Sequence, residues 1–324
     1  MARHRWIVSF TTLLAALTAC AGMGGAFGGW GASDDGDVGC ALALAGLALS
    51  CGREMALTCP GGAQPFSPTG VAFGPAGEAY VTDALNGSVF RLDGDRCVAI
   101  AEGWSRPYGV AVLDDGRVCV SHFTSADPLG RETAVSCWDG AGWILEVRGL
   151  GSGVNGLAAT PAGIWLAAWE DTPVESRNGV LLLVAAGSVQ QEVRLADGVP
   201  RFLAPRPDGG LLVTVVREDA SGITGGAVLE RSPDGRLVRS EHAFAQPAGI
   251  AWSDLGIWVA DDRSGELILL AHDGRRMIHP RRLQGAAGLA VSAEGDICVA
   301  EPGRGRIACV SREPMLGKEP HDEE

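Results

Sequence analysis

Short apolar runs separated by glycine-containing turns recur along most of the chain, and six of them open with the same phrase of small and apolar residues. Measured at the position that is glycine in five copies, successive openings are 39, 47, 46, 47 and 39 residues apart. The six positions are Gly70, Gly109, Gly156, Phe202, Gly249 and Gly288. A repeat of this length containing several short strands is typical of one blade of a β-propeller.

The repeat predicts an all-β, six-bladed β-propeller, because a four-stranded sheet of about 40 residues buries its two apolar faces only by stacking on neighbouring sheets around a ring. A strand-like run precedes every opening, but the first opening has no blade before it. The run at 54–59 stands before that opening, and the sixth copy ends after its third strand near Val310. We therefore expect an N-terminal strand to complete the last blade, which leaves no open sheet edge at the closure.

Four regions follow from the pattern. Residues 1–19 carry Arg3 and Arg5 ahead of an apolar run that is too short to span a bilayer, which is typical of a signal peptide. Residues 20–53 form a Gly-rich, Cys-containing tether, 54–312 the propeller, and 313–324 a disordered acidic tail. Leu17-Thr18-Ala19-Cys20 resembles the lipobox of bacterial lipoproteins. The resemblance implies lipidation of Cys20 and a body facing the periplasm or exposed on the outer membrane; the alternative is an ordinary cleaved signal.

Charge and composition exclude some classes of function. The chain has 26 basic and 39 acidic side chains, a formal charge of −13, so a nucleic-acid backbone would be repelled. Lys318 is the sole lysine and lies in the acidic tail, which argues against Schiff-base chemistry. Nucleic acid is therefore not an expected partner. The lipobox resemblance implies a membrane as one partner, through the N-terminal lipid, and we expect a protein or small-molecule ligand at the propeller face.

Eight cysteines remain after Cys20, an even number that indicates disulfides in an exported protein. Cys119 and Cys298 occupy the same position of the second strand in their blades, and Cys137 and Cys309 the same position of the third. Opposed residues of neighbouring antiparallel strands lie within disulfide reach. We predict the pairs Cys119–Cys137 and Cys298–Cys309. Three pairings of the other four stay open: Cys40, Cys51, Cys59 and Cys97.

The openings Pro-x-Gly-Val-Ala, together with Val81-Thr82-Asp83, Val259-Ala260-Asp261 and Val299-Ala300-Glu301, resemble NHL-repeat propellers and their gluconolactonase and senescence-marker relatives. The resemblance covers residues 68–311 and implies a six-bladed fold. The Trp-Asp signature of seven-bladed WD40 propellers is missing. Copy four departs from the pattern at Arg201-Phe202.

Four polar side chains end the second strand of consecutive blades around the ring: Asp261, Glu301, Asp83 and His122. Equivalent positions face one end of the channel, so these groups are candidates to converge on a substrate or on a divalent cation such as Ca²⁺, with Asp83, Asp261 and Glu301 as ligands. In the structural alternative, each Asp binds backbone amides of the following turn, and His122 is a rim residue. Copies three and four have Ala168 and Val215 at this position.

Asn155 matches the Asn-Gly-Leu that supplies a metal ligand in the gluconolactonase relatives. Two further acids of that family are replaced here, at Ser67-Pro68 and at Ala168, and in the structural alternative Asn155 is a turn residue. Relatives that bind pyrroloquinoline quinone use a basic, histidine-bearing pocket. The candidates by type are Arg201, Arg217, His242, His272 and His279.

These observations give three hypotheses of function. The first is a lipid-anchored, extracytoplasmic propeller that acts as a ligand- or protein-binding scaffold, with its face shaped by the long loops at 124–133, 171–179 and 217–226. The alternative is a divalent-metal-dependent lactonase or esterase, and the third is a quinone-dependent sugar dehydrogenase. No catalytic residue is assigned from the sequence.

Overall fold

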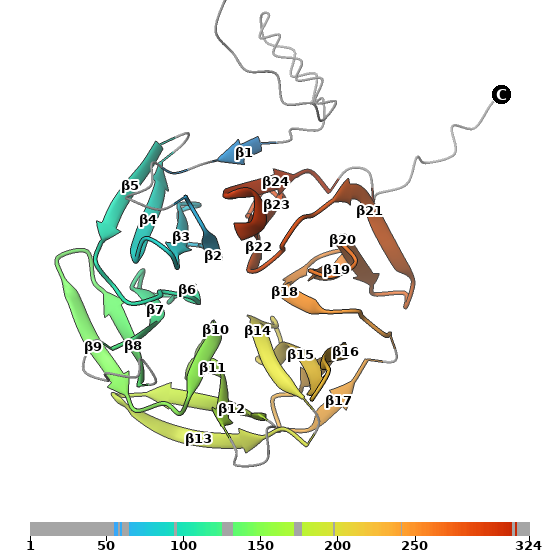
Figure 1. Ribbon diagram of the computed structural model, residues 1–324, viewed down its shortest axis with the longest axis horizontal. Helices are drawn as coiled ribbons and strands as arrows, with labels where there is room; N and C mark the ends of the chain where they lie inside the picture. Colours follow the sequence, from blue (N-terminus) through green and yellow to red (C-terminus); the bar gives the residue numbers. More distant parts are fainter. Residues whose placement is uncertain are drawn as a thin grey trace, which may run out of the picture. The chain divides into compact units, whose positions relative to one another are not determined.

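The computed structural model describes residues 55–57, 59, 65–93, 96–124, 132–171, 177–196, 198–240, 242–312 and 315, all within one compact unit of residues 49–324. Six four-stranded antiparallel sheets are arranged as the blades of a ring (Figure 1). The predicted all-β, six-bladed propeller is confirmed. Cys20, Cys40 and Cys51, the signal peptide, and all of the predicted acidic tail except Met315 lie outside the described residues.

Each of the first five blades is a simple up-and-down sheet whose first strand lines the channel. Blade 1 contains β2 (Pro68–Phe73), β3 (Ala79–Asp83), β4 (Ser88–Asp93) and β5 (Arg96–Ala101). Blade 2 contains β6 (Val110–Val112), β7 (Val118–Phe123), β8 (Thr133–Trp138) and β9 (Trp143–Arg148). Blade 3 contains β10 (Gly153–Thr160), β11 (Gly163–Asp171), β12 (Arg177–Ala185) and β13 (Ser188–Arg194).

Blade 4 contains β14 (Val199–Pro205), β15 (Leu211–Asp219), β16 (Gly222–Arg231) and β17 (Leu237–Arg239). Blade 5 contains β18 (Pro247–Ser253), β19 (Gly256–Asp261), β20 (Glu266–Ala271) and β21 (Arg276–Arg282). Blade 6 contains β22 (Leu289–Val291), β23 (Ile297–Glu301) and β24 (Arg306–Val310), with the 3-10 turn Pro302–Arg304 between the last two strands. No helix among the described residues is long and apolar enough to cross a membrane.

The N-terminal strand β1 (Met55–Leu57) completes blade 6, as the sequence predicts. It pairs antiparallel with β24, Met55 opposite Cys309 and Leu57 opposite Ile307. A disulfide between Cys59 and Cys97 then joins the segment after β1 to β5, the outer strand of blade 1. The ring is therefore closed twice between its last and first blades, once by backbone pairing and once covalently.

The taper of the ring explains the residue types of the inner strands. Adjacent blades converge toward the channel, so the innermost strand has room for small side chains and the second strand for large ones. In every blade an inner alanine is paired with a larger group on the second strand. The pairs are Ala72 with Tyr80, Ala111 with Cys119, Ala158 with Trp165, Ala204 with Leu212, Ala251 with Trp258 and Ala290 with Cys298.

Five buried apolar clusters fill the six gaps between blades, one of them extending over two gaps. The structure pairs Cys119 with Cys137 and Cys298 with Cys309, each pair directly opposed on adjacent strands with Cα atoms 4.0 Å apart. The first disulfide packs toward blade 3 and the second toward blade 1. Each therefore fills the gap position that an aromatic ring fills in blades 1, 3 and 5.

A buried hydroxyl joins neighbouring blades near the channel. Thr82 Oγ1 accepts a hydrogen bond from the Gly70 N–H at 2.8 Å and donates one to the Tyr108 carbonyl of blade 2 at 2.6 Å. Ser121 and Thr214 make the equivalent bridges from blades 2 and 4. These bonds satisfy backbone groups of the bulged inner strands that the sheet itself leaves unpaired.

The recurring glycine lies where the next blade comes closest. A Cβ at Gly109 would stand 2.3 Å from the Asn155 carbonyl oxygen, and one at Gly249 would stand 2.4 Å from that of Ala287. Any side chain there would push backbone against backbone, so the glycine of the repeat serves close packing of the blades.

Candidate functional site

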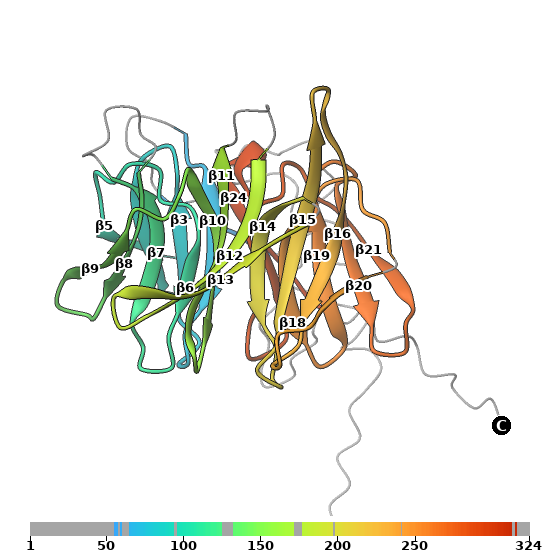
Figure 2. The ribbon, with the colours of Figure 1, turned by 90° about the horizontal axis from the view of Figure 1, so that it is seen from below.

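The two ends of the channel differ. At one end, which we call the long-loop face, the second strands finish and connect to the third strands; the β15–β16 hairpin projects beyond the other strands there (Figure 2). At the other end, which we call the short-turn face, tight turns at 74–78, 113–117 and 206–210 connect first to second strands. The four polar residues predicted to line the channel lie at the long-loop face.

Asp83 is fully buried and holds backbone turns. Its Oδ1 accepts hydrogen bonds from the N–H groups of Ser67, Leu85 and Asn86, each at 3.2 Å, and its Oδ2 accepts one from Asn86 Nδ2 at 2.8 Å. Both carboxylate oxygens are therefore used by the strand that enters blade 1 and by the turn that follows β3. This is the structural role that the sequence leaves as the alternative.

Asp261 repeats the arrangement in blade 5. Its Oδ2 accepts from the Ala245 N–H at 2.8 Å, and its Oδ1 accepts from the N–H groups of Gln246 at 3.2 Å and Ser264 at 3.0 Å. The residue is 1% exposed. A carboxylate that receives several amide hydrogens has little capacity left for a cation.

Glu301 is fully buried at the same position of blade 6 and combines an amide with two guanidinium groups. Its Oε1 accepts from the Gln284 N–H at 2.8 Å, and its Oε2 pairs with Arg306 Nε at 2.9 Å and with Arg281 at 3.8 Å. The nearby positive charge balances the buried carboxylate. Asp83 and Asp261 are thus engaged by the turns and entering segments of their own blades, whereas Glu301 also pairs with Arg281 of blade 5. Among the described residues no three His, Cys, Asp or Glu side chains gather as metal ligands would.

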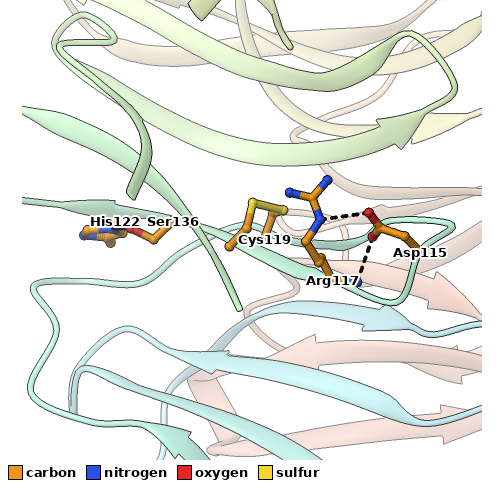
Figure 3. The surroundings of a disulfide bond; sticks show 6 residues. Asp115, Arg117, Cys119, His122 and Ser136 are labelled. Atoms are coloured by element: carbon orange, nitrogen blue, oxygen red, sulfur yellow. Dashed lines mark hydrogen bonds and ion pairs between the residues drawn. A yellow bond between two sulfur atoms is a disulfide. The ribbon is translucent and has the colours of Figure 1, made fainter. Parts of the chain in front are cut away.

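The His122 side chain lies on the side of blade 2 that faces blade 1, where it contacts polar groups and an aromatic ring. Its Nε2 lies 2.9 Å from Ser136 Oγ, its Nδ1 lies 3.1 Å from the Phe123 carbonyl oxygen, and its ring lies 4.4 Å from that of Trp104. Burial lowers the pKa of the His122 imidazole. Figure 3 shows His122 and Ser136 on one side of the disulfide at Cys119, well apart from the Arg117–Asp115 ion pair on the other.

Asn155 lies within β10, so the interpretation of this residue as a turn residue is wrong. Its Nδ2 donates a hydrogen bond to the Pro200 carbonyl of blade 4 at 2.9 Å, and the residue is 8% exposed. Blade 3 has Ala167 where blades 1, 2 and 4 have the bridging hydroxyl. The Asn155 amide makes the missing bridge to the next blade, and this accounts for an Asn at that place.

The five residues proposed by type for a quinone site are spread over the ring. His279 lies in the outer strand β21, 5% exposed, with Nε2 3.3 Å from the Ser311 carbonyl oxygen. His272 packs on Trp252 at the short-turn face, ring centroids 4.9 Å apart. Arg201 lies in β14 and Arg217 in β15, while His242 follows β17. They form no common pocket.

Two aromatic rings narrow the channel near the long-loop face. Tyr108 of blade 2 and Phe202 of blade 4 stack with centroids 6.0 Å apart and planes 28° apart. Because blade 3 separates these blades along the ring, the contact crosses the channel. Copy four departs from the repeat by having Phe202 in place of glycine, and this ring is what the departure provides.

A cavity lies at the opposite, short-turn end of the channel. It has a volume of about 460 Å³, and the inner strands of all six blades line it. The six alanines of the taper form one layer of its wall. The next layer toward solvent consists of the residues that follow them, which are Phe73, Val112, Ala159, Pro205, Trp252 and Val291.

The polar character of this central pocket comes from few side chains. Asp114 and Arg206 stand among the lining residues. Arg206 forms ion pairs with Asp208 and Glu230, and its guanidinium lies 5.3 Å from the centre of the Trp252 ring. The inner strands are sheet edges, so their unpaired N–H and C=O groups also face the channel. This site was not predicted from the sequence, because the polar candidates lie at the ends of the second strands. In the sequence, the pocket-lining positions can be found as the residues that follow the repeated alanines of the inner strands.

The chain matches no protein-family model and no curated protein sequence. Solved structures are similar in fold. A gluconolactonase of Xanthomonas campestris has a TM-score of 0.61 at 19% identity, over 81% of this chain and 90% of that one. Virginiamycin B lyase of Staphylococcus aureus has a TM-score of 0.54 at 13% identity, over 80% and 99%. A chain of the nidogen/laminin complex has a TM-score of 0.54 at 15% identity, over 68% and 83%. At these identities the likeness shows the fold alone.

Proposed function

We propose that the protein is an exported propeller that binds a ligand at its central pocket and acts as a binding module. The observation that carries the proposal is the pocket of about 460 Å³ to which every blade contributes its inner strand. Volumes of this order are usual for sites that enclose small molecules or one segment of a peptide. A closed ring with six packed interfaces holds such a site rigidly.

The lining favours a ligand that combines apolar surface with neutral hydrogen-bonding groups. Aliphatic side chains make up most of the wall, and Phe73 and Trp252 add aromatic surface at the mouth. The free edges of the inner strands offer amide donors and carbonyl acceptors, which recognise hydroxyl and amide groups without charge. Sugars and peptide segments have this chemistry.

Export and anchoring belong to the same proposal. The three disulfides, Cys59–Cys97, Cys119–Cys137 and Cys298–Cys309, indicate an oxidising compartment outside the cytoplasm. The signal-like segment and Cys20 support a lipid anchor on the periplasmic side or surface of an outer membrane. The tether would then hold the central pocket near that membrane.

A gluconolactonase-type metal site is not supported by the residues present. The amide of Asn155 is hydrogen-bonded to Pro200, and the oxygens of Asp83 and Glu301 accept hydrogens from backbone and guanidinium groups. Ala168 stands where an acid would complete the set. The disagreement favours a binding role for this chain. The nidogen/laminin structure supports it further, because there a propeller of the same fold is part of a complex between proteins.

A thermal-shift screen tests the proposal with purified protein and defined probes: mono- and disaccharides, a tripeptide library, glucono-1,5-lactone and Ca²⁺. A true ligand at about 100 times its Kd stabilises by about 2.7 kcal/mol, which raises the Tm of a domain of this size by roughly 5–10 °C. Trp252→Ala should abolish the shift. Trp138→Ala, which removes a half-buried Trp of blade 2, should leave it unchanged.

Hydrolysis of glucono-1,5-lactone tests the alternative in the same preparation. We expect no rate above the spontaneous one, with or without added divalent cations. A cation-dependent rate that disappears in both Asp83→Ala and Glu301→Ala would replace the binding proposal with the lactonase hypothesis.

A further inference from the structure

A second, smaller cavity lies between the last and first blades at the short-turn face. Its volume is about 210 Å³. Its apolar lining comes from both blades. Blade 1 contributes Val71, Phe73, Ala79 and Leu92, and blade 6 contributes Ile307 and the disulfide-bonded Cys298 and Cys309. We call it the seam crevice. An apolar cavity of about 150 Å³ is large enough for a benzene ring, so the seam crevice has room for one ring and a short chain.

The reason for a hollow at this place lies in the filling of the gaps between blades. Blade 5 fills its gap toward blade 6 with Trp258, which is fully buried. Blade 6 has Cys298 at the same position, and the Cys298–Cys309 disulfide occupies less volume than an indole. The gap between blades 2 and 3, which holds the Cys119–Cys137 disulfide, also has a crevice at the short-turn face. The disulfide cysteines line the wall of the seam crevice, but not that of the crevice between blades 2 and 3.

The mouth of the seam crevice is negatively charged. Glu294 and Asp296, on the turn between β22 and β23, line it together with Ser292. Neither carboxylate forms an ion pair with another residue in the described part of the chain. The Arg312 guanidinium lies against Gly295, between the two acids in sequence, but it is paired with Asp254. The Ser292 hydroxyl accepts from the Asp296 N–H at 3.2 Å, which fixes the turn that presents both acids.

We propose that the seam crevice binds a small apolar cation, an aromatic or aliphatic primary amine, with its hydrocarbon part between the blades and its ammonium group at Glu294 and Asp296. Apolar walls favour the hydrocarbon part by removing it from water, and a sulfur atom beside an aromatic ring adds a favourable contact. Because Arg312 is already paired with Asp254, the two carboxylates at the mouth select the cation over an anion of the same shape. The site is independent of the central pocket, although Val71 and Phe73 border both.

Calorimetric titration with three probes tests the inference. 2-Phenylethylammonium carries the ring and the positive charge, phenylacetate the ring with a negative charge, and ethylammonium the charge without the ring. We expect binding of the first alone, weakened by added salt because the mouth is exposed. Binding of ethylammonium as strong as that of 2-phenylethylammonium would reduce the effect to the general negative charge of the protein and overturn the proposal.

Variants locate the binding. Glu294→Gln with Asp296→Asn should weaken 2-phenylethylammonium binding about tenfold, and both substitutions lie on a surface turn that tolerates them. Glu146→Gln, in the crevice between blades 2 and 3, is the matched control and should change nothing. Trp252→Ala removes a wall of the central pocket alone. Full affinity in the double variant, or loss of affinity in Trp252→Ala, would contradict the seam crevice as the site.

Discussion

The covalent closure of the ring gives the most demanding prediction. β1 is three residues long and forms three register pairs with β24, so backbone pairing alone fastens the end of the ring weakly. The Cys59–Cys97 disulfide ties the same segment to the outer strand of blade 1, and Cys59 is 2% exposed among the apolar residues of that gap. We predict that Cys59→Ser with Cys97→Ser loosens the ring at this place before any other.

The magnitude follows from the length of chain that the bond closes. Cys59 and Cys97 are 38 residues apart. Constraining a loop of that length in the unfolded chain is worth about 4 kcal/mol at 25 °C, compared with about 3 kcal/mol for the 18-residue separation of Cys119 and Cys137. If loop entropy acted alone, the two double variants would differ by about 0.7 kcal/mol and would otherwise behave alike.

Two measurements separate the closure from loop entropy. Urea unfolding gives the free energy of each double variant, and hydrogen exchange reports the amides of β24, the strand that lies between β1 and β23. The Cys59/Cys97 variant should lose protection in β24 while blades 3 and 4 keep theirs. The Cys119/Cys137 variant should retain protection in β24. Equal protection of β24 in both variants, or a loss of less than about 1 kcal/mol at Cys59/Cys97, would refute the reasoning.

Three further substitutions test the packing and the charge of the ring. Gly109→Ala places a methyl group 2.3 Å from the Asn155 carbonyl oxygen and should cost about 1–3 kcal/mol in urea unfolding, whereas Gly142→Ala, with no atom within 4 Å, should cost less than about 0.5 kcal/mol. Trp258→Ala empties the gap between blades 5 and 6 and should cost about 3–5 kcal/mol. Because burial lowers the pKa of His122 in the folded protein, the unfolded chain binds more protons below about pH 6.5, and stability falls as the pH falls through that range. His122→Gln should therefore reduce the loss of unfolding free energy between pH 7.5 and pH 5; an unchanged loss would contradict this.

The sequence predicts the fold well because the repeat shows both the number of blades and the positions where they pack closely. The spacing from Gly70 to Gly288 reports six copies, and each glycine is required by the approach of the next blade rather than by a turn. The run ending at Cys59 is left without a blade of its own, and the sixth copy lacks an outer strand, so closure follows by counting. The partner of Cys59 does not follow, because three pairings satisfy the spacing equally.

The candidate site was harder to predict because it depends on partners distant in sequence. Asp83 and Asp261 end their strands as catalytic acids of a channel would. Their role is decided by the amides of Ser67 and Gln246, 16 and 15 residues away, which the fold brings to them. Conversely, nothing in the sequence distinguishes Trp252 from any other apolar residue of a strand. Its place at a pocket mouth follows only from the convergence of six inner strands.

The placement of polar groups explains why one ring can serve unlike functions. At the long-loop face of this chain, the Asp carboxylates hold turns and the segments that enter the blades, while hydroxyls and the Asn155 amide join neighbouring blades. Tyr108 stacks on Phe202 across the channel. A buried polar group that already has its hydrogen bonds is costly to redirect toward a ligand. At the short-turn face, the backbone groups on the edges of the inner strands are not needed to join the blades. Ligand recognition is therefore expected where the ring leaves its polar backbone unused, and the opposite face keeps the blades in register.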